Sequence, residues 1–78
     1  SVGSEMFVPI GSRNLIMYSH LTGYLKFVRI NSDSLFVEHF SYVGTGFDTM
    51  QFLKSRKEKF IVFHSTKTGE LKLQKIYI

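Results

Sequence analysis

The sequence contains no cysteine, no tryptophan and no alanine, and it has a single proline. Without cysteine, the chain can form neither a disulfide nor a thiolate metal site. Alanine is the best helix former, so its absence argues against helices. A chain of 78 residues buries a comparatively small fraction of its surface, and its stability must come from a well-packed core or from self-association.

The chain also lacks any run near the roughly 18 apolar residues that a membrane-spanning helix needs, so we expect no membrane partner. Residues 1–10 show neither the charged region nor the long apolar region of a secretory signal. The net charge of +4 is modestly basic and permits an anionic partner without requiring one. None of these features indicates a compartment, so localisation stays open.

What the sequence does contain is typical of strands. It has eight Phe and four Tyr, with many Val, Ile and Thr, and no stretch shows a convincing helical period. Turn residues separate seven strand-like runs, and the short links between them predict antiparallel hairpins. The predicted strands are 6–10, 14–19, 24–30, 35–42, 49–54, 59–64 and 70–78. The unbroken apolar runs 15–18 and 60–63 predict central strands.

Two segments of the chain resemble each other without gaps. Residues 14–30 (NLIMYSHLTGYLKFVRI) align on residues 60–76 (FIVFHSTKTGELKLQKI), which gives a period of about 46 residues. Upstream the spacing slips, although Val2-Gly3-Ser4 echoes Val43-Gly44-Thr45 and Met6 echoes Met50. The sequence therefore predicts one all-β domain over 1–78, with a first repeat at about 2–42 and an incomplete second repeat at about 43–78.

Four short antiparallel strands in 40–50 residues is the size of one β-propeller blade. The pattern resembles the blade repeats of tachylectin- and tectonin-type lectins, and also those of integrin-like and VCBS-type propellers. The residues that carry this resemblance are Val43-Gly44-Thr45-Gly46-Phe47-Asp48, Met50, Phe52, Thr68 and Gly69. The tryptophan common in lectin blades is missing, with Phe47 at the matching place, and no Asp-rich calcium loop is present.

Two blades cannot close a ring, which needs about four to eight. The blade interpretation therefore predicts a cyclic homo-oligomer, with a trimer of six blades as the first stoichiometry to expect. The alternative architecture is a monomeric small β-barrel or sandwich of seven strands.

No arrangement of residues points to catalysis, so we expect a protein that is not an enzyme and holds no metal or cofactor. The three histidines lack a zinc-ligand spacing, and the six acids offer no favoured pair for glycoside hydrolysis. Gly44-Thr45-Gly46 is not followed by the helix that a nucleotide loop requires.

The resemblance implies a carbohydrate-binding module. Tyr24 and Phe47 are candidates for stacking on a sugar ring, and His20 and Arg29 for hydrogen bonds to its hydroxyls. Two alternatives stay open. Aromatic side chains on a basic sheet also suit a barrel that binds single-stranded nucleic acid, and a structural or protein-interaction module needs no small ligand at all.

Overall fold

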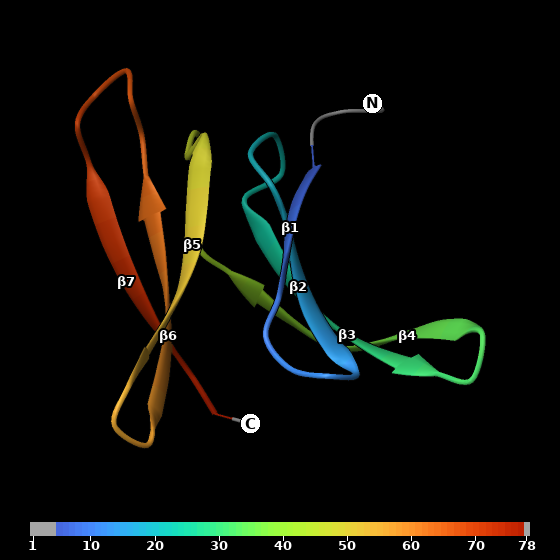
Figure 1. Ribbon diagram of the computed structural model, residues 1–78. Coiled ribbons are helices and arrows are strands. Elements are labelled where there is room, and N and C mark those ends of the chain that lie inside the picture. The colour runs from blue at the N-terminus through green and yellow to red at the C-terminus, as the bar shows by residue number, and fades with distance from the viewer. Residues whose placement is uncertain (1–4, 78) are drawn as a thin grey trace. The chain divides into compact units, whose positions relative to one another are not determined.

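Residues 5–77 are described by a computed structural model, in which every regular element is a β-strand (Figure 1). Seven strands form two open antiparallel sheets, one of four strands and one of three. The four-stranded sheet has the order β1-β2-β3-β4, with β1 (Glu5–Pro9), β2 (Asn14–Ser19), β3 (Tyr24–Asn31) and β4 (Ser34–Tyr42). The three-stranded sheet has the order β5-β6-β7, with β5 (Thr49–Ser55), β6 (Glu58–His64) and β7 (Leu71–Ile76).

The all-β fold class predicted from the sequence is confirmed, and each of the seven expected strands is present. Their ends agree with the expected ones to within two residues, and Ile78 lies outside the described residues. The apolar runs 15–18 and 60–63 lie in β2 and β6, and each of these strands has a neighbour on both sides, as β3 also does. Neither sheet closes on itself, so the closed-barrel alternative is not what forms.

The chain divides into two compact units, Ser1–Gly46 and Phe47–Ile78. The first unit contains β1 to β4, and the second contains β5 to β7. In both units each strand pairs with the next one along the chain, so each sheet is a simple meander (Figure 1). Short links leave no length for a crossover, which is why only antiparallel neighbours occur.

The β2–β3 hairpin and the β6–β7 hairpin have the same register. In the first, Tyr18 lies opposite Leu25 and Asn14 lies opposite Arg29. Adding 46 to each number gives the pairs of the second hairpin, from His64–Leu71 to Phe60–Lys75. The agreement covers every pair between β2 and β3, so the aligned residues of the two segments occupy matching places on their sheets.

The turns within the two hairpins also form the same hydrogen bonds. The Gly23 N–H donates to the Ser19 carbonyl at 2.8 Å, and the Gly69 N–H donates to the Ser65 carbonyl at 2.8 Å. The two glycines have φ angles of 80° and 81°, which L-residues with a Cβ rarely adopt. In both turns the threonine N–H donates to the buried serine Oγ at 3.4 Å, in the pairs Thr22–Ser19 and Thr68–Ser65.

The upstream echo is less regular than the hairpins. Met6 lies opposite Tyr18, whereas Met50 lies opposite Phe63, which is the counterpart of Met17. The predicted equivalence of Met6 and Met50 is therefore wrong by one position, because the link between β1 and β2 (residues 10–13) is longer than the link between β5 and β6 (residues 56–57). The predicted echo at Val2-Gly3-Ser4 lies outside the described residues.

Tyr18 links the segment that follows β4 to the first sheet. Its side chain is fully buried, and its hydroxyl donates to the Gly44 carbonyl at 2.6 Å. The N–H groups of Val43 and Gly44 both donate to the Gly23 carbonyl, at 2.8 and 3.2 Å. The chain after β4 therefore crosses directly over the Thr22-Gly23 turn.

This crossing gives a matched pair of glycine substitutions. A Cβ on Gly23 would come within 2.8 Å of the Gly44 backbone, whereas a Cβ on Gly69 would meet nothing within 4 Å. Both substitutions to Ala suffer the same left-handed backbone strain, about 1–2 kcal/mol. We expect Gly23→Ala to destabilise its hairpin by about 1–3 kcal/mol more than Gly69→Ala, because only Gly23 adds a steric clash.

The measurement is amide hydrogen exchange in each hairpin, combined with thermal unfolding of the whole chain. Equal losses of stability in the two variants would contradict this expectation, because residues 43–44 would then move away from the new methyl group without destabilising the hairpin.

In the second unit, Asp48 is the residue before β5, and its side chain is hydrogen-bonded to the turn that follows β6. The Thr66 hydroxyl and the Thr66 N–H both donate to the Asp48 carboxylate, the latter at 2.9 Å. These two hydrogen bonds lower the pKa of Asp48 below its ordinary value of 3.8. The bond from the Thr66 hydroxyl has the larger effect, and the bond from the Thr66 N–H has the second largest. The Asp48 N–H in turn donates to the His64 carbonyl at 3.1 Å.

A carboxyl whose pKa is lower in the folded state stabilises the fold while it is ionised. This stabilisation is fully present above about pH 3.8 and is lost as the pH falls through the folded-state pKa. We therefore expect the stability difference between the wild type and Asp48→Asn to be constant near neutral pH and to shrink below pH 3.8. Denaturant unfolding from pH 7 to pH 2 measures it, with Asp33→Asn as a control. A difference that stays level down to pH 2 would contradict the assignment.

Candidate ligand-binding cleft on the first unit

An open cleft of about 690 Å³ lies at the turn end of the β2–β3 hairpin. Its lining combines apolar and aromatic side chains with one acid, one base and three hydroxyls, and consists of Glu5, Ser19, Leu21, Thr22, Tyr24, Lys26 and Phe40. All of these residues belong to the first unit. The cleft is therefore complete within one compact part of the chain.

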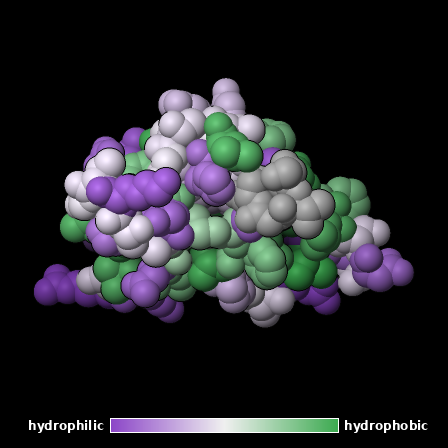
Figure 2. All heavy atoms as spheres, turned by 90° about the horizontal axis from the view of Figure 1, so that it is seen from above, coloured by the Kyte–Doolittle hydropathy of each residue, from purple (hydrophilic) through white to green (hydrophobic). Residues whose placement is uncertain are grey.

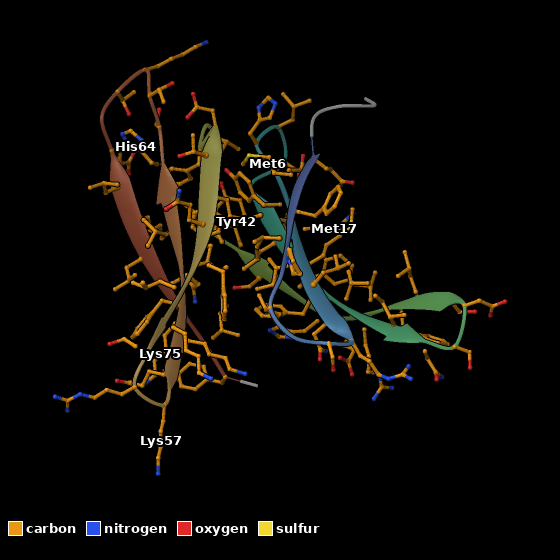
Figure 3. The ribbon with its side chains drawn as sticks, viewed as in Figure 1. Met6, Met17, Tyr42, Lys57, His64 and Lys75 are labelled. Carbon is orange, nitrogen blue, oxygen red and sulfur yellow. The ribbon has the colours of Figure 1, made fainter. Side chains whose placement is uncertain are left out.

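Tyr24 is the aromatic residue predicted from the sequence to stack on a ligand, and it lines this cleft. Its side chain is 45% exposed, and its ring meets the ring of Tyr42 edge-on at 5.3 Å between centroids. The backbone N–H of Tyr24 donates to the Thr22 hydroxyl at 3.4 Å. Tyr42, which is labelled in Figure 3, lies directly opposite Tyr24 in the sheet and steadies its ring.

The charged residues of the cleft form an ion pair, with Lys26 Nζ 3.0 Å from Glu5 Oε1. Glu5 starts β1 and lies opposite Ser19, while Lys26 lies on β3 opposite Met17. The pair therefore bridges the central strand β2 on one face of the sheet. Both side chains are about one-third exposed, so each can also bond to a ligand from solvent.

This arrangement places an aromatic ring beside a hydrogen-bond acceptor, a donor and the Thr22 hydroxyl. An apolar ring face can contact the C–H groups of a sugar, while a carboxylate and an ammonium can bond its hydroxyls. Ligand sites commonly combine apolar walls with a few polar groups in this way.

The remaining residues predicted for the site lie elsewhere. Arg29 is near the opposite end of β3 from Tyr24, and it lines a smaller cleft of about 380 Å³ with Arg13, Ile30, Asn31 and Ser32. His20 lies in the turn after β2, where its carbonyl accepts the Gly46 N–H at 3.0 Å. The structure thus brings neither His20 nor Arg29 into the lining of the Tyr24 cleft.

Phe47 is part of the core of the second unit. Its side chain is 3% exposed, and its ring packs against Phe63 at 5.6 Å between centroids. A ligand could stack on Phe47 only if the surrounding side chains moved away. Phe47 therefore belongs to the packing of its unit and not to the cleft.

Of the seven residues that line the cleft, sequence reasoning predicted Tyr24 as a site residue and missed the other six, among them Glu5, Lys26 and Phe40. Glu5 and Lys26 are 21 positions apart, and they meet only because β1 and β3 flank the same strand. Phe40 lies opposite Lys26 through the pairing of β3 with β4. The alternation of β3 is the one sequence signal that could have placed Tyr24 and Lys26 on a common face.

Residues 5–77 hold no group of three or more His, Cys, Asp or Glu side chains that could bind a metal ion. Over the same range, no helix is present that is long and apolar enough to span a membrane.

Comparisons of this chain with protein-family models, with curated proteins and with solved structures gave no match. The function is therefore argued from the geometry of the described residues.

Proposed function

We propose that this chain is a non-catalytic carbohydrate-binding module that is built from two propeller-blade-like repeats and completed by self-association. The observation that carries the binding proposal is the cleft in which the exposed Tyr24 ring stands beside the Glu5–Lys26 ion pair. The cleft is shallow and open, as suits a ligand with many hydroxyls that keeps part of its hydration.

Two features of the backbone support the blade-like interpretation. A four-stranded antiparallel meander such as β1-β2-β3-β4 is the unit from which propellers are built. The identical register and turn hydrogen bonds of the two hairpins fit two copies of one ancestral unit. The second unit contributes the counterparts of the first three strands.

The composition of the cleft supports binding over hydrolysis. Glycoside hydrolysis generally uses two carboxyl groups placed on either side of the bond that breaks. Among the described residues that line the cleft, Glu5 supplies one carboxylate, and it is held by Lys26 at 3.0 Å. A paired carboxylate of this kind is suited to accept a hydroxyl hydrogen bond.

The first test of the proposal is Tyr24→Ala. A glycan array of neutral and sulfated oligosaccharides identifies a ligand, and titration calorimetry with that glycan gives its affinity. We expect the substitution to weaken binding about tenfold or more, because it removes the stacking surface, a loss of roughly 1.4 kcal/mol.

The control is Tyr77→Ala, which removes an exposed tyrosine of the second unit that lies 5.3 Å from Lys75 Nζ. This variant should bind the glycan as the wild type does. An array without a ligand, or equal affinities of the wild type and Tyr24→Ala, would refute the proposed site.

A second candidate function is supported by the smaller cleft. Arg13 and Arg29 both line it, and the exposed Phe36 lies opposite Arg29 on β4. Two guanidinium groups beside an aromatic ring suit the phosphates and bases of single-stranded nucleic acid. Arg29 Nε is 3.7 Å from Glu38 Oε2, an exposed pair that a phosphate could replace.

The second candidate predicts a strong dependence on salt. Binding of a fluorescein-labelled thymidine oligonucleotide should weaken steeply as salt rises, and Arg13→Gln with Arg29→Gln should reduce the slope of log K against log[salt] by about one to two. Fluorescence anisotropy measures both. No binding at 50 mM salt would exclude this candidate and leave the carbohydrate proposal unchanged.

A further inference from the structure

Each unit has one apolar sheet face that stays exposed. The first open face belongs to β1–β4 and carries Phe7, Leu15, Met17, Leu35, Val37 and Phe40. The second open face belongs to β5–β7 and carries Leu53, Leu71 and Leu73, with Val62 between them. Phe7 and Leu71 are each 69% exposed and Leu73 is 60% exposed, which is unusual for large apolar side chains on a sheet.

The register shows that these are opposite faces of the same structural unit. Met17 lies on the first open face, and its counterpart Phe63 is fully buried in the second unit. Leu71 lies on the second open face, and its counterpart Leu25 is fully buried in the first unit. The same holds for the pair Leu15 and Ile61, since Leu15 is half-buried and Ile61 is fully buried.

Figure 3 helps to locate the two faces. Met6 and Met17 lie on opposite sides of the first sheet, because Met6 is paired with Tyr18 and Met17 with Phe7. His64 and Lys75 mark the two ends of the second open face. Figure 2 shows apolar side chains reaching the molecular surface among polar ones.

From this pattern we propose that the first open face of one copy packs on the second open face of another copy. The inference rests on the proposed repeat and names the partner as a second copy of this chain. A unit of this type is able to bury either face, since each face is buried in one of the two hairpins. The two open faces are the faces that stay exposed within one chain. Packing the first open face of one copy on the second open face of the next therefore covers both kinds of face.

Such a contact is heterologous, because it joins two different surfaces of the same chain. A heterologous contact closes into a ring when the rotation between copies permits, and it otherwise continues as an open chain. Contact through a face and its copy would instead stop at a dimer. The number of copies in the assembly therefore distinguishes this arrangement from a symmetric dimer.

The arrangement also bears on the proposed sugar site. Glu5, Tyr24, Lys26 and Phe40 lie on the first open face, at the end where the β2–β3 turn is located. Phe7 lies further along that face, opposite Met17. A second copy that covers Phe7 and Met17 would border the cleft, so the ligand would lie at the seam between copies.

The experiment measures native mass by light scattering over a range of concentrations. The wild type should show a multiple of 9.0 kDa. Phe7→Glu and Leu73→Glu each place a charge on one open face, and each variant alone should be a 9.0 kDa monomer. Phe36→Glu, which lies on the other side of the first sheet, is the matched control and should assemble as the wild type does.

Mixing the two interface variants gives the decisive result. Phe7→Glu keeps an intact second face and Leu73→Glu keeps an intact first face, so the mixture should form a one-to-one dimer and nothing larger. Circular dichroism and thermal unfolding establish that both variants fold, as their exposed positions predict.

A monomeric wild type at every concentration would overturn the inference, and so would a variant that dimerises alone or a mixture that stays monomeric. These outcomes are read from the native mass alone, without any glycan present. Tyr24→Ala tests glycan binding and should leave the native mass unchanged, so failure of one proposal is distinguishable from failure of the other.

Discussion

The turn that joins β2 to β3, and its counterpart between β6 and β7, is the constraint on which the rest of the structure depends. A buried serine accepts the threonine N–H, and a glycine at positive φ closes the turn. This geometry fixes the register of each hairpin, and a shift of one residue would send every side chain to the opposite face. The register therefore decides which side chains form the core and which meet solvent.

The cleft is a direct result of that register. Lys26 lies one strand away from Met17 and can reach Glu5 only because β2 is in the centre of its sheet. Tyr24 is held at the turn by the Thr22 hydroxyl and by the edge of Tyr42. A ring fixed in this way loses little conformational entropy on contact with a ligand, which favours its use as a platform.

The two proposals are linked, because the proposed assembly and the proposed binding site involve the same sheet face. A small chain that leaves Phe7, Leu71 and Leu73 in water forgoes much of the hydrophobic stabilisation its sequence could supply. The proposed association with a second copy would recover that contribution and would place the Tyr24 cleft at the border of the contact. In the proposed assembly, packing between copies and ligand binding therefore use neighbouring parts of the first open face.

The sequence by itself determined the strands, the antiparallel pairing and the matching hairpins, because turn residues, short links and β-favouring side chains act locally. It also named Tyr24, together with Phe47, as a candidate for stacking on a ligand. Tertiary structure alone decided that Phe47 is in the core and that Arg29 lies far along β3 from Tyr24. It also decided that Glu5 and Lys26 meet, and that Leu71 and Leu73 face solvent despite their regular alternation. Alternation divides the side chains of a strand between two faces, but it does not specify which face will be covered.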